Sequence, residues 1–354
     1  MKTDVHRIAT INETDALASK LKPQASPESR RKAVASLGAI VAAPFVLGSQ
    51  ARAQAAWPTR PVKYINPFPP GGTTDILSRL FCAKMSEVTG QQWVVENIGG
   101  GGGDIGVSSV ARAAPDGYTL GLGGVASHAI SPTLKAGKLS FDPERDFTFF
   151  TNIWALPNFL VSNLALPAST LPELIELLKK NPGKYSYASA GLGTTLHISG
   201  ELFKLYAGVD MLHVPYRGGA PAMVDVIGGQ VQMIFDNIPG ALAQYNAGKV
   251  KGFGVTSAKR SPVVPDIPAI GEFLPGYDLS SWTSMCGPAK IPAVIVERAS
   301  MFAKKALDSP DLQKAFLERG ATTFWLSPQD AVAYRASEAK RLGDIITRAK
   351  ITLD

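Results

Sequence analysis

Short apolar segments of strand length alternate with amphipathic segments of helical length along most of this chain. Near the start, residues 62–68 and 93–96 are expected to form strands, and residues 75–88 place most of their apolar side chains on one stripe of a helix. The alternation resumes later, where the expected strands and helices are residues 185–188, 196–206, 211–214, 220–227, 231–235 and 250–256. This pattern predicts an α/β fold.

The chain is long enough for two α/β units. Its 354 residues, 45% of them hydrophobic, can fill one large core or two ordinary ones. The apolar stretch 147–162 is long enough to cross from one lobe to the other, and the region 279–286 could return. We therefore expect two lobes joined by a hinge, with lobe 1 formed by residues 56–156 plus 280–354 and lobe 2 by residues 157–279.

A final helix is expected from residue 328 to about residue 349. Ser327 provides an N-cap, Pro328 stands at the first helical position and Asp330 is the acid of a capping box. Because the apolar residues of this segment fall mostly on one side, we expect the helix to pack on lobe 1.

The first 55 residues have the features of an export signal. The pair Arg30-Arg31 precedes an uncharged run at residues 33–50, and Ala51-Arg52-Ala53 follows it. This pattern indicates a twin-arginine signal, with cleavage after Ala53 or Ala55 and a periplasmic protein as the product. A membrane anchor is the alternative, but the run is shorter than the roughly 20 apolar residues of a spanning helix.

Charge and cysteine content exclude several classes of function. The leader holds eight basic and four acidic residues, which leaves about +3 of the net charge of +7, too little to indicate nucleic-acid binding. Cys82 and Cys286 could form a disulfide in an oxidising compartment or be two small buried hydrophobic residues. Two cysteines and four dispersed histidines form no recognisable metal motif, so we expect neither metal nor cofactor.

A glycine-rich turn between the first expected strand and helix is the most informative segment. It contains Phe68, Gly71, Gly72, Thr73, Thr74 and Asp75. Glycines allow close approach of the backbone to a ligand, and the free N–H groups at a helix start favour an anion. The two threonines add hydroxyl donors, and Asp75 could cap the helix or orient a water. Alone, such a turn is more often only structural.

Turns of the same kind recur in the second half. One contains Ser189, Ala190, Gly191, Gly193, Thr194 and Thr195, and could face the first turn across a cleft. His197 follows one turn inside the helix, where a structural hydrogen bond is expected. In a third turn, Tyr216 could cover a ligand and Arg217 could either pair with a carboxylate or be solvated. Asp236 could point at the cleft or cap the next helix, and Ser127 completes the candidate set.

These segments resemble the substrate-binding proteins of the tripartite tricarboxylate transporter family, also called the Bordetella uptake gene family. The resemblance covers nearly all of the chain after the leader, in the family's order. Its motifs are Trp57-Pro58, Arg60-Pro61, Pro70-Gly71-Gly72-Thr73-Thr74-Asp75, Val95-Glu96-Asn97, Pro115-Asp116-Gly117-Tyr118-Thr119, Ser189-Ala190-Gly191 with His197, Val214-Pro215-Tyr216-Arg217-Gly218, Phe235-Asp236 and Val264-Pro265-Asp266-Ile267-Pro268 with Glu272. The family's Asn-Arg-Pro-Gly-Ala-Gly-Gly appears here with glycines at residues 99–103, so this loop is expected to be looser. Ala269 also replaces a usual threonine.

The resemblance implies a two-lobed periplasmic binding fold, type II-like, in which each lobe is a mixed sheet flanked by helices and the ligand lies in a cleft between the lobes. It also implies that backbone amides, small hydroxyls and waters recognise a small carboxylate. The bound protein would deliver this ligand to two membrane subunits through transient contacts. We expect a monomer with no catalytic residues.

Three alternatives remain at this stage. Residues 101–106 match G-x-G-x-x-G, but the following expected strand ends in Gly123-Gly124 and lacks the acid of a dinucleotide site. A hydrolase is disfavoured because no G-x-S-x-G elbow occurs and Ser199 is expected inside a helix. The same binding lobes could also serve a membrane sensor in place of a transporter.

Overall fold

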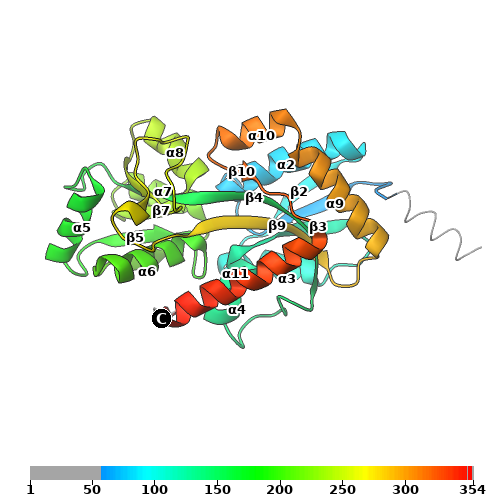
Figure 1. The fold of residues 1–354 in the computed structure, drawn as a ribbon, viewed down its shortest axis with the longest axis horizontal. Coiled ribbons are helices and arrows are strands. Elements are labelled where there is room, and N and C mark those ends of the chain that lie inside the picture. Colours follow the sequence, from blue (N-terminus) through cyan, green and yellow to red (C-terminus); the bar gives the residue numbers. More distant parts are fainter. Residues whose placement is uncertain (1–56, 349, 353–354) are drawn as a thin grey trace, which may run out of the picture. The chain divides into compact units, whose positions relative to one another are not determined.

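The computed structural model describes residues 57–348 and 350–352. The predicted export signal lies outside the described residues. In the described part, strands and helices alternate along the chain as predicted (Figure 1). No helix in this part is both long enough and apolar enough to cross a membrane.

Ten strands form one mixed sheet, in the order β2-β1-β3-β9-β4-β7-β5-β6, with β8 and β10 both paired with β4. In the first half, β1 pairs in parallel with β2 and β3, and β3 runs antiparallel to β9. In the second half, β5 pairs in parallel with β6 and β7. The strands are β1 (Val62–Asn66), β2 (Trp93–Asn97), β3 (Thr119–Gly124), β4 (Phe147–Ser162), β5 (Ser186–Ser189), β6 (Leu212–Pro215), β7 (Met233–Asn237), β8 (Lys251–Val255), β9 (Ser280–Pro288) and β10 (Thr322–Thr323).

The long strand β4 connects the two halves of the sheet. Its residues from Phe147 to Pro157 pair with β9, and its residues from Asn158 to Ser162 pair with β7. Successive side chains on a strand point to opposite faces, and Phe159 and Leu160, both fully buried, belong to different hydrophobic clusters. The stretch that the sequence predicted to cross the molecule is therefore a single strand, which Pro157 does not interrupt. Figure 1 shows β4 and β9 side by side along this path.

Helices cover both halves of the sheet. They are α2 (Thr73–Thr89), α3 (Asp104–Ala111), α4 (Ser131–Leu134), α5 (Leu171–Lys180), α6 (Thr195–Ala207), α7 (Gly219–Ile227), α8 (Ile238–Asn246), α9 (Ala293–Leu307), α10 (Pro310–Leu317) and α11 (Pro328–Arg348). The predicted N-cap of α11 is confirmed, because the Asp330 amide donates to Ser327 Oγ at 3.1 Å. The Asp330 carboxylate accepts from Ser327 Oγ at 2.7 Å, in place of the Ser327 amide that a capping box uses. The Trp282 indole N–H of β9 donates to Glu338 of α11 at 3.1 Å, which ties this last helix to the sheet.

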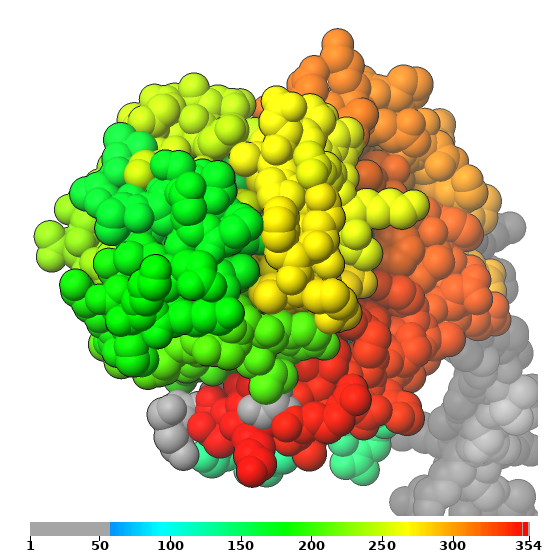
Figure 2. All heavy atoms as spheres, turned by 60° about the vertical axis from the view of Figure 1, so that its left-hand side comes forward, coloured from blue at the N-terminus to red at the C-terminus, as the bar shows by residue number. Residues whose placement is uncertain are grey.

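The connection after β8 returns the chain to β9 along the surface. Figure 2 shows this connection (yellow) between the segment of residues 160–210 (green) and the C-terminal helices (orange to red). It is held by a bidentate ion pair, with Arg260 Nη2 2.7 Å from Glu272 Oε2 and Arg260 Nε 2.8 Å from Oε1. Glu272 also accepts the Ala269 amide at 2.9 Å. These bonds link Arg260, near the start of this connection, to the short turn of residues 270–272.

Cys82 and Cys286 are both buried and free. Burial raises the pKa of the Cys286 thiol to about 12. Of the two alternatives that the sequence left open, the structure therefore supports two small buried hydrophobic residues over a disulfide.

Candidate functional site

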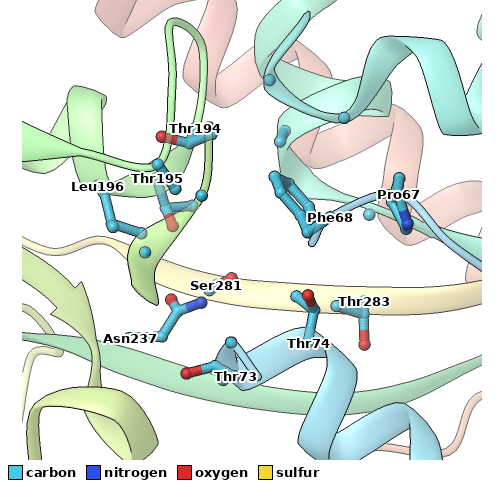
Figure 3. A pocket seen from close by; sticks show the side chains of 18 of the residues that line it. Pro67, Phe68, Thr73, Thr74, Thr194, Thr195, Leu196, Asn237, Ser281 and Thr283 are labelled. Atoms are coloured by element: carbon cyan, nitrogen blue, oxygen red, sulfur yellow. The ribbon is translucent and has the colours of Figure 1, made fainter. Parts of the chain in front are cut away.

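A cavity of about 760 Å³, a volume that includes its opening, lies where several helices begin. Loops that follow β1, β3, β5 and β7 contribute to its lining, together with the first residues of strand β9. Figure 3 shows Phe68 and Thr195 on opposite sides, with Ser281 of β9 between them and Thr283 farther along the same strand. In α/β sheets, ligands commonly bind beyond the carboxyl ends of the strands, and this cavity has that location.

Nine of the sixteen candidate residues line this cavity. The first turn contributes Phe68 and the start of α2, and the second turn contributes the start of α6. The nine are Phe68, Gly72, Thr73, Thr74, Ser127, Ala190, Thr194, Thr195 and Asp236. The structure thus brings together both predicted turns, which are more than 100 residues apart in the sequence.

The other two candidates from the first turn, Gly71 and Asp75, bond to each other and hold the turn in place. Asp75 is 4% exposed and accepts hydrogen bonds from the Gly71 amide and from Asn97 Nδ2, both at 2.9 Å. It also forms an ion pair with Arg79 at 2.9 Å. These bonds lower the pKa of Asp75 and outweigh its burial, which alone would raise it. Neither Gly71 nor Asp75 lines the cavity, and Asp75 fixes the turn.

The second turn is supported in the same way. Ser189 is buried, and its hydroxyl lies 2.7 Å from His213 Nε2 and accepts the Gly191 amide at 3.1 Å. The Gly193 amide donates to His197 Nδ1 at 3.3 Å, and His197 stacks on His213 with ring centroids 4.2 Å apart. Burial lowers the pKa of His197 to about 4, so the ring is neutral at pH 7. His197 is structural, as predicted.

A second hollow opens beside the first. It is lined by Gly191, Tyr216, Arg217 and Lys135 together with the glycine loop that follows β2. Lys135 Nζ is held 2.6 Å from Asp104 Oδ2 and donates to the Gly101 carbonyl at 2.7 Å. Tyr216 donates to Asp225 at 2.6 Å. Tyr216 and Arg217 therefore lie at this outer hollow and do not line the main cavity.

Several lining residues were not predicted from the sequence. The glycine loop contributes Gly102 and Gly103, and β9 contributes Ser281 and Thr283. Residues 101–103 form a tight turn, and Lys135 Nζ donates to the Gly101 carbonyl within it, while the expected looseness of this loop stays a prediction. Asn237 also lines the cavity, and it could have been predicted from its position directly after Asp236 at the end of a strand.

Three buried polar atoms in the lining have no hydrogen-bond partner within the described residues. They are Thr73 Oγ1, Asn237 Oδ1 and Thr283 Oγ1. Burial of a polar group without a partner costs about 1–3 kcal/mol, so such groups in a native structure require a ligand or an ordered water. All three belong to residues that line one cavity, so a polar molecule bound there would find groups with which to pair.

The electrostatic character of the cavity comes from backbone dipoles. The lining includes the first residues of α2, α6 and α7 and the N-caps of α3 and α8, which are Thr73, Thr195, Gly219, Gly103 and Asn237. Helix N-termini carry partial positive charge and free N–H donors, and they favour anions. No lysine or arginine is among the described lining residues. The arrangement can therefore bind an anion through amides and hydroxyls without a formal positive charge.

One lining hydroxyl is oriented by a buried histidine. Ser127 Oγ lies 2.8 Å from His128 Nδ1, and the Gly124 amide donates to the same nitrogen at 3.3 Å. Burial lowers the pKa of His128 to about 3, so the ring is neutral at pH 7. Since Nδ1 accepts from the Gly124 amide, it also accepts from the Ser127 hydroxyl, and the Ser127 oxygen is free to accept from the cavity.

The enzyme alternatives find little support in the geometry. The glycine run does lie between β2 and α3, but β3 ends in glycine with no acid, so the acceptor for a ribose is missing there. Ser199 lies inside α6, is fully buried and accepts a hydrogen bond from Asn158 at 2.9 Å. It is not an exposed nucleophile.

Comparison with known proteins identifies relatives of this chain. Residues 77–351 match the family model described as "Tripartite tricarboxylate transporter family receptor". A Pseudomonas protein, the UPF0065 protein of the tcbD-tcbE intergenic region, is 36% identical over 310 residues, which cover 86% of this chain and 91% of that protein. BugT of Bordetella pertussis is 31% identical over 298 residues, covering 83% and 91%.

Solved structures show the same fold. A periplasmic transporter is 37% identical with a TM-score of 0.82, and the match covers 84% of this chain and all of that one. Rpa4515 of R. palustris with adipate is 36% identical with a TM-score of 0.81, covering 84% and 99%. MatC from Rhodopseudomonas palustris with bound malate is 31% identical with a TM-score of 0.77, covering 82% and 100%. The chain belongs to the receptor family of the tripartite tricarboxylate transporters and has the two-lobed α/β fold of periplasmic binding proteins.

Proposed function

We propose that this protein captures a small mono- or dicarboxylate, aliphatic or aromatic, between its two lobes outside the cytoplasmic membrane. It then delivers the ligand to the membrane subunits of a tripartite tricarboxylate-type transporter. The observation that carries the proposal is the convergence of several helix N-termini on one cavity that has unpartnered hydroxyls and no lysine or arginine in its described lining. This arrangement favours a carboxylate over a neutral or cationic ligand.

The related proteins support the same class of ligand. One neighbour at 36% identity is described with adipate and another at 31% identity with bound malate. We accordingly propose that this protein is a binding protein and not an enzyme. It would act in the periplasm as a monomer without a cofactor, after cleavage of its leader at Ala53 or Ala55.

The proposed binding mode uses both turns. The ligand carboxylate is directed at the turn of residues 71–74 and at the turn of residues 190–195, one from each proposed lobe. The proposed lobes are residues 56–156 plus 280–354 and residues 157–279. The glycine loop that follows β2 closely approaches the turn of residues 190–195, since a Cβ atom at Gly102 would lie 2.4 Å from the Leu192 carbonyl oxygen. This approach supports a cleft that closes on its ligand and excludes water, which strengthens every hydrogen bond inside it.

Replacement of Thr73 by valine tests this binding mode. Valine keeps the shape of threonine but removes the buried hydroxyl, which has no partner within the described residues. A hydrogen bond to a charged group contributes about 1.5–3 kcal/mol, so we expect carboxylate binding to weaken roughly tenfold to a hundredfold. The dissociation constant is measured by isothermal titration calorimetry.

Thr148→Val is the matched control, because Thr148 lies on β4 and is not part of the cavity lining. Its dissociation constant should equal that of the wild type. Unchanged affinity in both Thr73→Val and Thr74→Val would exclude the proposed position of the carboxylate.

A thermal-shift screen tests the ligand class. The panel contains adipate, malate, an aromatic carboxylate, amino acids, sugars and nicotinamide nucleotides. A ligand that binds only the native state adds about 2.7 kcal/mol of stability at a hundredfold excess over its dissociation constant. We expect the midpoint to rise with one or a few carboxylates only, whereas a rise with nucleotides alone would contradict the proposal.

A further inference from the structure

Asp236 places a buried carboxyl group in a cavity that we propose takes an anion. It is 5% exposed, lies on β7 and lines the cavity. Within the described residues, the only hydrogen bond it accepts comes from the Asn237 amide to Oδ1, at 2.9 Å. An ionised carboxylate normally accepts several hydrogen bonds, so the protein offers the ionised form of Asp236 fewer hydrogen-bond donors than it needs.

Backbone encloses the Asp236 carboxyl on two sides. A Cβ atom added at Gly219 would lie 2.8 Å from Oδ1, and one added at Gly240 would lie 2.5 Å from Oδ2. The Cβ position at Gly240 is also 3.4 Å from Thr73 Oγ1, so the threonine hydroxyl borders the same small space. Asp236, Thr73 and Asn237 therefore form one polar wall of the cavity, and two of the three carry unpartnered buried atoms.

No packed element brings a positive charge to this carboxyl. Strand β4 carries no ionisable side chain. The ionisable side chains of the other elements around β7 interact with residues other than Asp236. Their interactions are Tyr187 with Glu201, Lys204 with Glu201, His197 on His213, Asp225 with Tyr216, Tyr245 on Phe159, Asp75 with Arg79, and Lys84 with Glu87. Burial, opposed only by the Asn237 amide, raises the pKa of Asp236 to about 7. Near neutral pH this carboxyl is thus already divided between its two protonation states.

A bound carboxylate would favour the protonated state further. Two carboxylates that share a water-excluded site cannot both be ionised without strong repulsion, and one of them then holds a proton. A protonated carboxyl offers an O–H donor, which a neighbouring anion can accept. The cavity lining supplies no lysine or arginine that could relieve the repulsion instead.

We propose that Asp236 takes up one proton from solvent when the protein captures a carboxylate, and that its protonated oxygen donates a hydrogen bond to the ligand or to the polar wall beside it. One O–H bond forms on Asp236, the ligand remains an anion and no other bond changes. Asp236 is then a specificity-determining residue that makes anion capture depend on pH. This inference rests on the proposed function, because it requires a carboxylate ligand in this cavity.

The direction of the pH dependence follows from this linkage. Below the pKa of Asp236 in the free protein, the proton is already present and the dissociation constant is independent of pH. Above it, each binding event must take a proton from solvent, so the dissociation constant rises tenfold per pH unit until the pKa of the complex is reached. Simple carboxylate ligands have pKa values near those of Asp and Glu, about 4, so they stay ionised between pH 6 and pH 9 and do not contribute.

The test is calorimetric titration of the purified protein with adipate, and with the tightest carboxylate of the screen, at pH 6, 7, 8 and 9. From pH 6 to pH 9 we expect the dissociation constant to rise roughly a hundredfold. Repeating the titration at pH 8 in buffers of different ionisation enthalpy counts the protons, and we expect uptake of nearly one per ligand. Asp236→Asn keeps a permanent N–H donor, so its affinity should be flat across this range and exceed that of the wild type at pH 9.

Asp266→Asn is the control, since Asp266 is exposed and should retain the wild-type slope. A carboxylate that binds with a flat dissociation constant and no proton uptake would overturn the inference and leave the proposed function intact. If no carboxylate of the panel binds at any pH, the proposed function fails and the inference fails with it. The proton count of the wild type decides the question even if Asp236→Asn does not fold.

Discussion

Gly102→Ala is expected to weaken ligand binding tenfold to a hundredfold, whereas Gly101→Ala leaves it nearly unchanged. A Cβ atom at Gly102 would lie 2.4 Å from the Leu192 carbonyl oxygen, which belongs to the turn on the other side of the cavity. Overpacking of this kind costs about 1–3 kcal/mol, and it arises where the glycine loop that follows β2 meets the turn of residues 190–195. Calorimetric titration with the carboxylate found in the screen measures the effect.

The two glycines form a matched pair. Both have positive φ, 63° at Gly101 and 73° at Gly102, so alanine strains the backbone to a similar degree at each. At Gly101, however, the nearest atoms to an added Cβ lie at 3.7 Å, in ordinary contact. Equal losses of affinity in the two variants would show that backbone strain, and not the approach of the two turns, explains the effect.

Phe159→Ala is expected to lower the free energy of unfolding by about 3–5 kcal/mol. Phe159 is fully buried on β4, pairs with Asp236 of β7 and Val255 of β8, and packs on Tyr245 with ring centroids 5.4 Å apart. Its loss would leave a cavity at the centre of the sheet. Urea unfolding, followed by circular dichroism, measures the change.

Phe273→Ala serves as the comparison, because Phe273 is the same residue type but is 46% exposed. A surface replacement of this kind should change the free energy of unfolding by only about 0.5 kcal/mol. Equal destabilisation by the two replacements would contradict the central position that the structure gives to β4.

The sequence predicted the elements of the fold well, because strand and helix periodicities are local. The exact ends of the elements depend on individual residues, such as prolines and helix caps, and not on periodicity. β1 ends at Asn66, two residues before the predicted end, since the following Pro67 has no N–H group for a sheet ladder. α2 begins at Thr73, two residues before the predicted start, with Gly72 as its N-cap. The strand character of the whole 147–162 stretch was less apparent because Pro157 lies within it.

The sequence identified the turns of the site but not which of their residues face the cavity. Asp75 and Ser189 are polar residues of the right turns, yet their hydrogen bonds are made within the turns themselves. Ser281 and Thr283 face the cavity because of the register of β9 against β4, which pairs residues more than 120 positions apart. Gly102 matters because of its approach to Leu192. Such long-range contacts leave no periodic signal in a single sequence.

The most direct test of the account compares one carboxylate with its methyl ester in calorimetric titrations of the purified protein. The ester keeps the carbon skeleton but removes the charge that the helix N-termini and hydroxyls are proposed to bind. We predict one carboxylate bound per protein molecule, with affinity at least a hundredfold lower for the ester. Equal affinity for the two compounds would contradict carboxylate recognition and, with it, the proposed role of this cavity.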